Sequence, residues 1–195
     1  SRDWSSDVCS SDLAAVAWPA HIFWKLGRRT PGTLSIWIIS LSLTAALVVQ
    51  AVTAARPAPL WLQLLADVGS AAVLGATLTA MLLGHWYLTT PTMSLQPLRW
   101  FCPVLAVAAL VRLAATLAGI AEIDLQELDL IRWLWLSLRV LGGVLGPLLA
   151  AILVRSILQY RNTQSATGVL FAILILVFMG EMSAALLERD FGLPL

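Results

Sequence analysis

Charged residues are scarce in this sequence of 195 residues. They make up 12% of the chain, whereas hydrophobic residues make up 59% and the mean hydropathy is +0.87. Soluble domains are typically about 45–50% apolar and about 25% charged. A chain this apolar needs lipid as its solvent, so the composition predicts an integral membrane protein. No basic run is long enough to indicate binding to nucleic acid.

Cysteine and recognisable catalytic motifs are also lacking. The chain has two cysteines, Cys9 and Cys102, with none of the spacings that bind metal ions. A nucleophile elbow, a phosphate-binding glycine loop, a zinc-protease helix and a carboxylate pair for acid–base catalysis are all missing. We therefore assign no catalytic or metal-binding residue and favour a non-enzymatic role. An intramembrane enzyme acting on lipid is the least supported alternative.

The first residues differ in character from the rest of the chain. The stretch DWSSDVCSSDL, residues 3–13, resembles one reading frame of a short-read sequencing adapter at every position. We interpret residues 1–13 as a non-native segment, with a genuine polar tail as the alternative, and exclude them from fold reasoning. Of the 12 basic and 11 acidic residues in the chain, 11 basic and 8 acidic ones then remain.

Five stretches are long and apolar enough to span a bilayer, whose core of about 30 Å requires about 20 helical residues. Their predicted ranges are about 33–54, 60–88, 98–120, 130–158 and 167–187. Residues 14–24 are apolar but too short to span, and we interpret them as the end of a sixth helix truncated upstream, with an interfacial segment as the alternative. The sequence thus predicts an all-α polytopic bundle that forms a single domain over residues 14–195.

Positive charges fall mainly in one set of connections between these spans. If residues 25–32 are cytoplasmic, the inner connections hold six basic residues and no acid, whereas the outer ones hold three basic and six acidic residues. Cytoplasmic loops of membrane proteins carry an excess of Lys and Arg. We therefore predict a multi-pass protein of the cell inner (plasma) membrane with its C-terminus outside. The six inner basic residues are Lys25, Arg28, Arg29, Arg99, Arg155 and Arg161.

Four charged residues lie inside the predicted spans: Asp67, Arg112, Arg139 and Glu181. A charge at the bilayer centre costs about 2.5–3.5 kcal/mol on insertion scales, so such groups usually face the bundle interior and pair. The helix rise places Arg112 and Glu181 each about 20 Å from the cytoplasmic side. We predict two pairs, Arg112 with Glu181 and Arg139 with Asp67, and contact between Arg139 and Glu181 is the alternative.

These charges allow three interpretations. They can lock helices together, line a cavity for an anionic or polar ligand, or, for the two arginines, extend toward the interface. A carboxylate held by arginine stays ionised, which makes Glu181 a poor proton carrier. Our leading hypothesis is binding or transport of a small polar or amphiphilic ligand at a site built from Arg112, Arg139 and Glu181. A purely structural scaffold is an alternative.

A second group of candidate residues, His85, Trp86 and Tyr87, lies near the predicted inner end of a span. A lone histidine beside aromatic residues is most often part of the interfacial belt. A headgroup- or quinone-like ligand is the second interpretation. Haem at His85 is the weakest, because His21 is the only other imidazole. Either ligand would suit a membrane subunit of a respiratory or assembly complex, whose partners would be other membrane subunits as well as the lipid bilayer.

Small residues indicate where helices pack closely, because close backbone approach stabilises helix pairs in lipid. One set of small residues recurs every four positions and predicts a helix–helix contact. A glycine-rich stretch followed by proline predicts a contact and a kink in the fourth span. The first set is Ala72, Ala76, Ala80 and Gly84. The glycine-rich stretch consists of Gly142, Gly143 and Gly146, followed by Pro147.

Overall fold

The computed structural model describes residues 29–53, 58–89, 94–122 and 129–191. These residues are 93% helical and contain no strand, which confirms the all-α prediction. The segment 1–13 and the truncated helix predicted at 14–24 lie outside the described residues. The chain divides into two compact units, residues 1–54 and 55–195, and each is described by itself.

All five predicted spans are helices long and apolar enough to cross a membrane. Most extend beyond the predicted range by a few residues at one or both ends. The chain is therefore a multi-pass helical membrane protein. The helices are α2 (Arg29–Thr53), α3 (Leu60–Thr89), α4 (Gln96–Ile120), a fourth span composed of α5 (Leu130–Leu138), the π-helical η2 (Arg139–Leu145) and α6 (Gly146–Gln159), and α7 (Thr163–Phe191).

Helix α2 belongs to the first unit. Its hydroxyl side chains donate hydrogen bonds to carbonyl oxygens of the preceding turn, as Ser42 does to Ile39 at 2.9 Å and Thr44 to Ser40 at 2.8 Å. Polar groups in lipid must be satisfied within the protein, because the bilayer core offers no water. Serine and threonine therefore do not prevent α2 from spanning a membrane.

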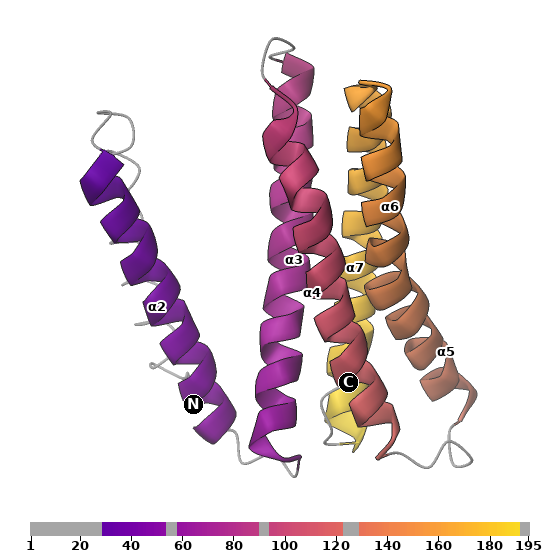
Figure 1. Ribbon diagram of the computed structural model, residues 1–195. Helices are drawn as coiled ribbons and strands as arrows, with labels where there is room; N and C mark the ends of the chain where they lie inside the picture. The colour runs from indigo at the N-terminus through magenta and orange to yellow at the C-terminus, as the bar shows by residue number, and fades with distance from the viewer. Residues whose placement is uncertain (1–28, 54–57, 90–93, 123–128, 192–195) are drawn as a thin grey trace. The chain divides into compact units, whose positions relative to one another are not determined.

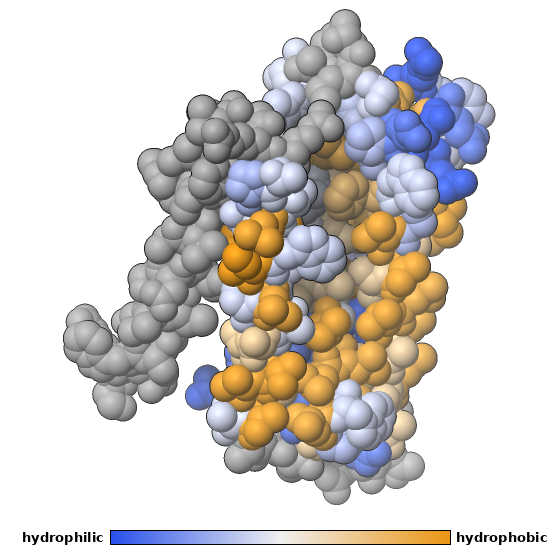
Figure 2. All heavy atoms as spheres, turned by 60° about the vertical axis from the view of Figure 1, so that its left-hand side comes forward, coloured by the Kyte–Doolittle hydropathy of each residue, from blue (hydrophilic) through white to orange (hydrophobic). Residues whose placement is uncertain are grey.

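The second unit is a ring of four neighbouring helices. Helix α3 packs against α4 and α7, and α6 packs against the same two helices (Figure 1). One end of this bundle carries the α3–α4 connection and the α6–α7 turn, and we call it the turn end. The opposite end carries the start of α3, the α4–α5 connection and the end of α7, and we call it the C-terminal end. Figure 2 shows hydrophobic residues over the middle of the molecule and hydrophilic residues gathered at its upper end.

Small side chains allow the helices of the bundle to approach closely. Ala76 and Ala80 are buried, and a Cβ atom added to Gly84 would lie 2.9 Å from Oγ1 of Thr167 on α7. The predicted contact face of this span is therefore confirmed. Helix α3 as a whole packs against both α4 and α7.

The fourth span departs from regular α-helix where its glycines and proline lie. Residues Arg139–Leu145 form the π-helix η2, and the N–H of Gly146 donates to the carbonyl of Leu141, five residues earlier. Pro147 has no N–H to donate, and its ring clashes with the carbonyl four residues before it in a regular α-helix. A π-turn accommodates this conflict with an extra residue per turn. Figure 1 shows that α5 and α6 run in different directions, so the predicted kink is present.

Candidate functional site

Glu181 on α7 accepts hydrogen bonds from arginines on two other spans. Arg112 on α4 binds it with two nitrogens: Nε lies 3.2 Å from Oε1, and Nη2 lies 3.0 Å from Oε2. Arg139 at the start of η2 donates from Nη1 to Oε1 at 2.7 Å. One carboxylate therefore joins three spans through charge-assisted hydrogen bonds, which are about twice as strong as neutral ones.

Two hydroxyl groups complete this network. Ser70 on α3 donates to Oε2 of Glu181 at 2.7 Å. Thr116 on α4 accepts from Nη2 of Arg139 at 3.2 Å and donates to the carbonyl of Arg112 at 2.9 Å. We call the set Ser70, Arg112, Thr116, Arg139 and Glu181 the Glu181 cluster. It draws on all four spans of the second unit.

The members of the Glu181 cluster lie at one level of the bundle because of their positions along the helices. Ser70 is ten residues into α3, Arg112 eight residues before the end of α4, Arg139 nine residues after the start of α5, and Glu181 ten residues before the end of α7. At 1.5 Å per residue, each lies about 12–15 Å from the C-terminal end. The cluster is therefore inside the bundle and well away from either end.

Glycines bring the charged helices close enough for these contacts. A Cβ atom at Gly180, the residue before Glu181, would overlap the backbone of Gly143 in η2. A Cβ at Gly143 would lie 2.7 Å from Nη1 of Arg139. On α3, a Cβ at Gly69 would lie 3.1 Å from Cδ of Arg112. Larger residues at these positions would push the arginines and Glu181 apart.

The cluster is deeply buried for a group of charges. Arg139 is 0% exposed and Arg112 3%, while the Glu181 side chain is 12% exposed. Removing an ion from water costs several kcal/mol, which only good geometry and additional hydrogen bonds compensate. Among the residues that the structure describes, Nε of Arg139 is a buried donor without an acceptor. Such an atom in a native structure calls for a specific explanation.

The structure brings three of the four predicted intramembrane charges together. The predicted Arg112–Glu181 pair is present, and so is the alternative contact between Arg139 and Glu181. The Arg139 guanidinium donates to Glu181 and Thr116, so the predicted pair of Arg139 with Asp67 is wrong. Asp67 lies on α3, three residues before Ser70, with its Oδ2 atom buried.

The candidates His85, Trp86 and Tyr87 lie elsewhere. They occupy the turn end of α3, about 22 Å along the helix from Ser70. His85 and Trp86 are exposed, and the His85 ring meets Phe171 edge-on at 6.4 Å between centroids. Tyr87 is buried, and its hydroxyl donates to the carbonyl of Ser94 at 2.7 Å, which links the last turn of α3 to the chain just before α4. The structure thus gives His85 a ring contact and Tyr87 a hydrogen bond, while Trp86 is exposed.

Sequence reasoning missed the hydroxyl groups and the glycine contact at the Glu181 cluster. Neither Thr116 nor Ser70 is among the candidate residues selected from the sequence. Gly180 directly precedes Glu181, and Thr116 follows Arg112 by one helical turn. A search for small and hydroxyl residues beside intramembrane charges would have found both.

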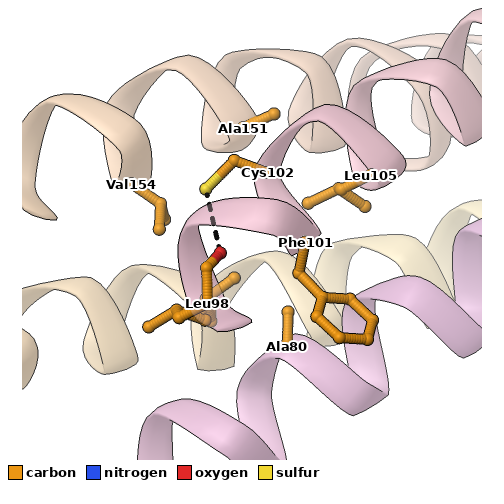
Figure 3. A pocket seen from close by; sticks show the side chains of 8 residues that line it. Ala80, Leu98, Phe101, Cys102, Leu105, Ala151 and Val154 are labelled. Carbon is orange, nitrogen blue, oxygen red and sulfur yellow. Dashed lines mark hydrogen bonds between the residues drawn. The ribbon is translucent and has the colours of Figure 1, made fainter. Parts of the chain in front are cut away.

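A gap between α3, α4, α6 and α7 is too small to be a ligand site. Its volume is about 10 Å³, and side chains such as Leu98, Phe101 and Leu105 line it (Figure 3). A cavity needs roughly 10–15 Å³ to hold a single water molecule. Cys102 also lines this gap and donates from Sγ to the carbonyl of Leu98 at 3.5 Å. The gap is a packing feature of the core.

Comparison with known proteins assigns no family to this chain. No protein family matches its sequence, and no match was found among curated proteins or solved structures. Its function is therefore inferred from the geometry of its own side chains.

Proposed function

We propose that this membrane protein binds or transports a small polar or amphiphilic ligand with an anionic group, and that the Glu181 cluster is its binding site. The observation that carries the proposal is the buried Nε of Arg139, a donor with no acceptor in the described part of the chain. An unsatisfied buried donor costs about 1–3 kcal/mol. An anionic ligand that accepts from this nitrogen would remove that cost.

The chemistry of the cluster fits an anion. A guanidinium presents a planar fork of donors that matches carboxylate and phosphate groups. In the Arg139 guanidinium, Nη1 already donates to Glu181 and Nη2 donates to Thr116. A ligand carboxylate or phosphate would bind at Nε or compete with Glu181 for the guanidinium. Arg139 would be the main ligand-binding residue, and Glu181 would hold it in place.

The location of Arg139 supports a coupling between binding and helix conformation. It is the first residue of η2, and π-helical turns occur frequently at functional sites. A shift of the π-turn by one residue would rotate Arg139 relative to Glu181 and α7. Ligand binding that favours one of the two arrangements would change the conformation of the fourth span.

The proposal predicts saturable stabilisation by small anions. Acetate, succinate and inorganic phosphate would each be titrated into the purified full chain in detergent, and the midpoint of thermal unfolding would be followed. We expect at least one of them to raise the midpoint saturably, because a ligand that binds only the folded state stabilises it. The double variant Arg139→Gln/Glu181→Gln should weaken this binding by more than about tenfold.

A matched double variant controls for the loss of an ion pair. Arg132→Gln/Asp190→Asn removes an exposed pair of the same spans, whose Nε–Oδ2 distance is 3.3 Å, and changes the net charge equally. It should bind the anion as the unmodified protein does. If no anion gives a saturable shift, or if both double variants bind equally, the Glu181 cluster is a structural lock and the binding proposal is wrong.

We further propose that the turn end of the bundle faces the cytoplasm of an inner (plasma) membrane. In the second unit, the described residues at this end include Arg99, Arg155 and Arg161 but no acid. Cysteine labelling in intact cells tests the orientation, after Cys9 and Cys102 are replaced by serine. A membrane-impermeant maleimide should label Glu122→Cys directly and Asn162→Cys only after permeabilisation. The reverse pattern would invert the topology.

A further inference from the structure

A cleft at the turn end of the bundle has an unusual charge. Its volume is about 380 Å³, and among the residues that the structure describes, Arg99, Arg155 and Gln159 line it. Arg99 belongs to the first turn of α4, and the other two lie four residues apart on α6. The described lining thus holds two cations and an amide and no acid, and such a surface attracts an anion with several oxygen atoms.

The two arginines have different roles in this cleft. Nη2 of Arg99 donates to the carbonyl of Leu158 at 3.2 Å, which fixes its guanidinium against the last turn of α6. Arg155 is exposed, and among the described residues it forms no ion pair or side-chain hydrogen bond. One guanidinium is therefore held in place, while the other is available to a ligand.

The start of α4 adds a further attraction for anions. Its N-cap residue Leu95 provides no side-chain hydrogen bond to the first turn, and Pro97 follows within that turn. A helix N-terminus carries a partial positive charge from its unpaired N–H groups. Arg99 lies within this turn, so the helix dipole and its side chain act on the same side of the cleft.

Apolar side chains continue from the cleft toward the middle of the bundle. Ile152 lies three residues before Arg155 on α6 and is 69% exposed, and Val107 lies eight residues after Arg99 on α4 and is 60% exposed. The helical repeat places each on the same face as its arginine. The adjacent aromatic residues Trp100 and Tyr160 are also exposed, as is typical at a membrane interface.

We propose that this cleft binds the phosphate of an anionic glycerophospholipid. The phosphate would accept from Arg99, Arg155 and Gln159, and the acyl chains would lie along the apolar surface that contains Val107 and Ile152. A soluble phosphate compound could use the same arginines but would not use this surface. The site is separate from the Glu181 cluster, which lies about 12–15 Å from the opposite end.

Native mass spectrometry of the full chain in detergent tests the proposal, with phosphatidylglycerol as the probe and phosphatidylcholine as the zwitterionic comparison. We expect tighter binding of phosphatidylglycerol. Arg155→Gln should lower the affinity for phosphatidylglycerol by about tenfold, because it removes a hydrogen bond to a charged group. Arg155→Lys should retain part of the affinity. Arg161→Gln is the matched control, because it removes an arginine at the same end that does not line the cleft.

Three results would overturn the proposal. The first is that Arg155→Gln and Arg161→Gln weaken lipid binding equally, which would indicate general charge attraction. Phosphatidylcholine could bind as tightly as phosphatidylglycerol. Millimolar inorganic phosphate could displace the lipid completely, which would assign the cleft to a soluble anion. Circular dichroism of each variant would establish that it is folded. We expect Arg155→Gln to fold, because Arg155 forms no ion pair or side-chain hydrogen bond among the described residues.

Discussion

Glu181→Gln is expected to destabilise the folded protein by about 3–5 kcal/mol, the usual cost of removing one partner from a buried ion pair. The substitution leaves the Arg112 and Arg139 guanidiniums close together without the anion that they share. Both are almost completely buried, so water cannot replace the carboxylate. An amide oxygen can accept one of the hydrogen bonds but cannot balance either charge. Unfolding in mixed micelles with increasing dodecyl sulfate, followed by circular dichroism, measures the change.

Asp190→Asn is the matched control for Glu181→Gln. It is the same type of substitution on the same helix, and Asp190 pairs with Arg132 at 3.3 Å. This pair is more than one-third exposed on each side, and exposed pairs contribute about 0–1 kcal/mol. The two substitutions should therefore differ by several kcal/mol. Equal effects would mean that Glu181 is hydrated or that its arginines find other partners.

Gly180→Ala should cost about 1–3 kcal/mol, the range for overpacking a tightly packed core. The added methyl group would overlap the Gly143 backbone, and backbone atoms cannot move aside as a flexible side chain can. Helix α7 would have to move away from η2, which would also lengthen the Glu181–Arg139 contact next to it. The same dodecyl sulfate titration measures the loss.

Gly168→Ala on the same helix is the control for this substitution. A Cβ at Gly168 meets nothing within 4 Å, so the change is free of steric conflict. Alanine has a higher helix propensity than glycine by about 1 kcal/mol, and the variant should be as stable as the unmodified protein or more so. If Gly180→Ala and Gly168→Ala had equal stability, the close approach of α7 and η2 would be refuted.

The five spans could be predicted from sequence because lipid imposes simple requirements on a chain. A spanning helix needs about 20 apolar residues, and the polar segments at 121–129 and 159–166 separate such stretches clearly. The boundaries were less accurate. Helix α2 begins at Arg29, four residues before the predicted start, because a helix need not end where its run of apolar residues ends.

The partners of the intramembrane charges were only partly predictable. Helix rise gave the depth of Arg112 and Glu181 and hence their pairing. Depth does not give rotation about the helix axis, and this angle decides which side chains converge. The π-turn at Arg139–Leu145 changes the rotation of α5 relative to α6, and its first residue, Arg139, contacts Glu181. The sequence indicated a kink at Gly146–Pro147. It did not indicate the π-turn, whose extra residue changes the rotation of the residues before it.

A double-mutant cycle between Arg139 and Glu181 tests the sharing of one buried carboxylate most directly. Stability would be measured for Arg139→Gln, Glu181→Gln and the double variant, with Arg132→Gln and Asp190→Asn as a parallel cycle. We predict a coupling energy of about 2–3 kcal/mol for the buried pair, near the upper end for contacting residues, and below about 1 kcal/mol for the exposed one. A coupling energy for Arg139 and Glu181 as small as that of the exposed pair would contradict the account.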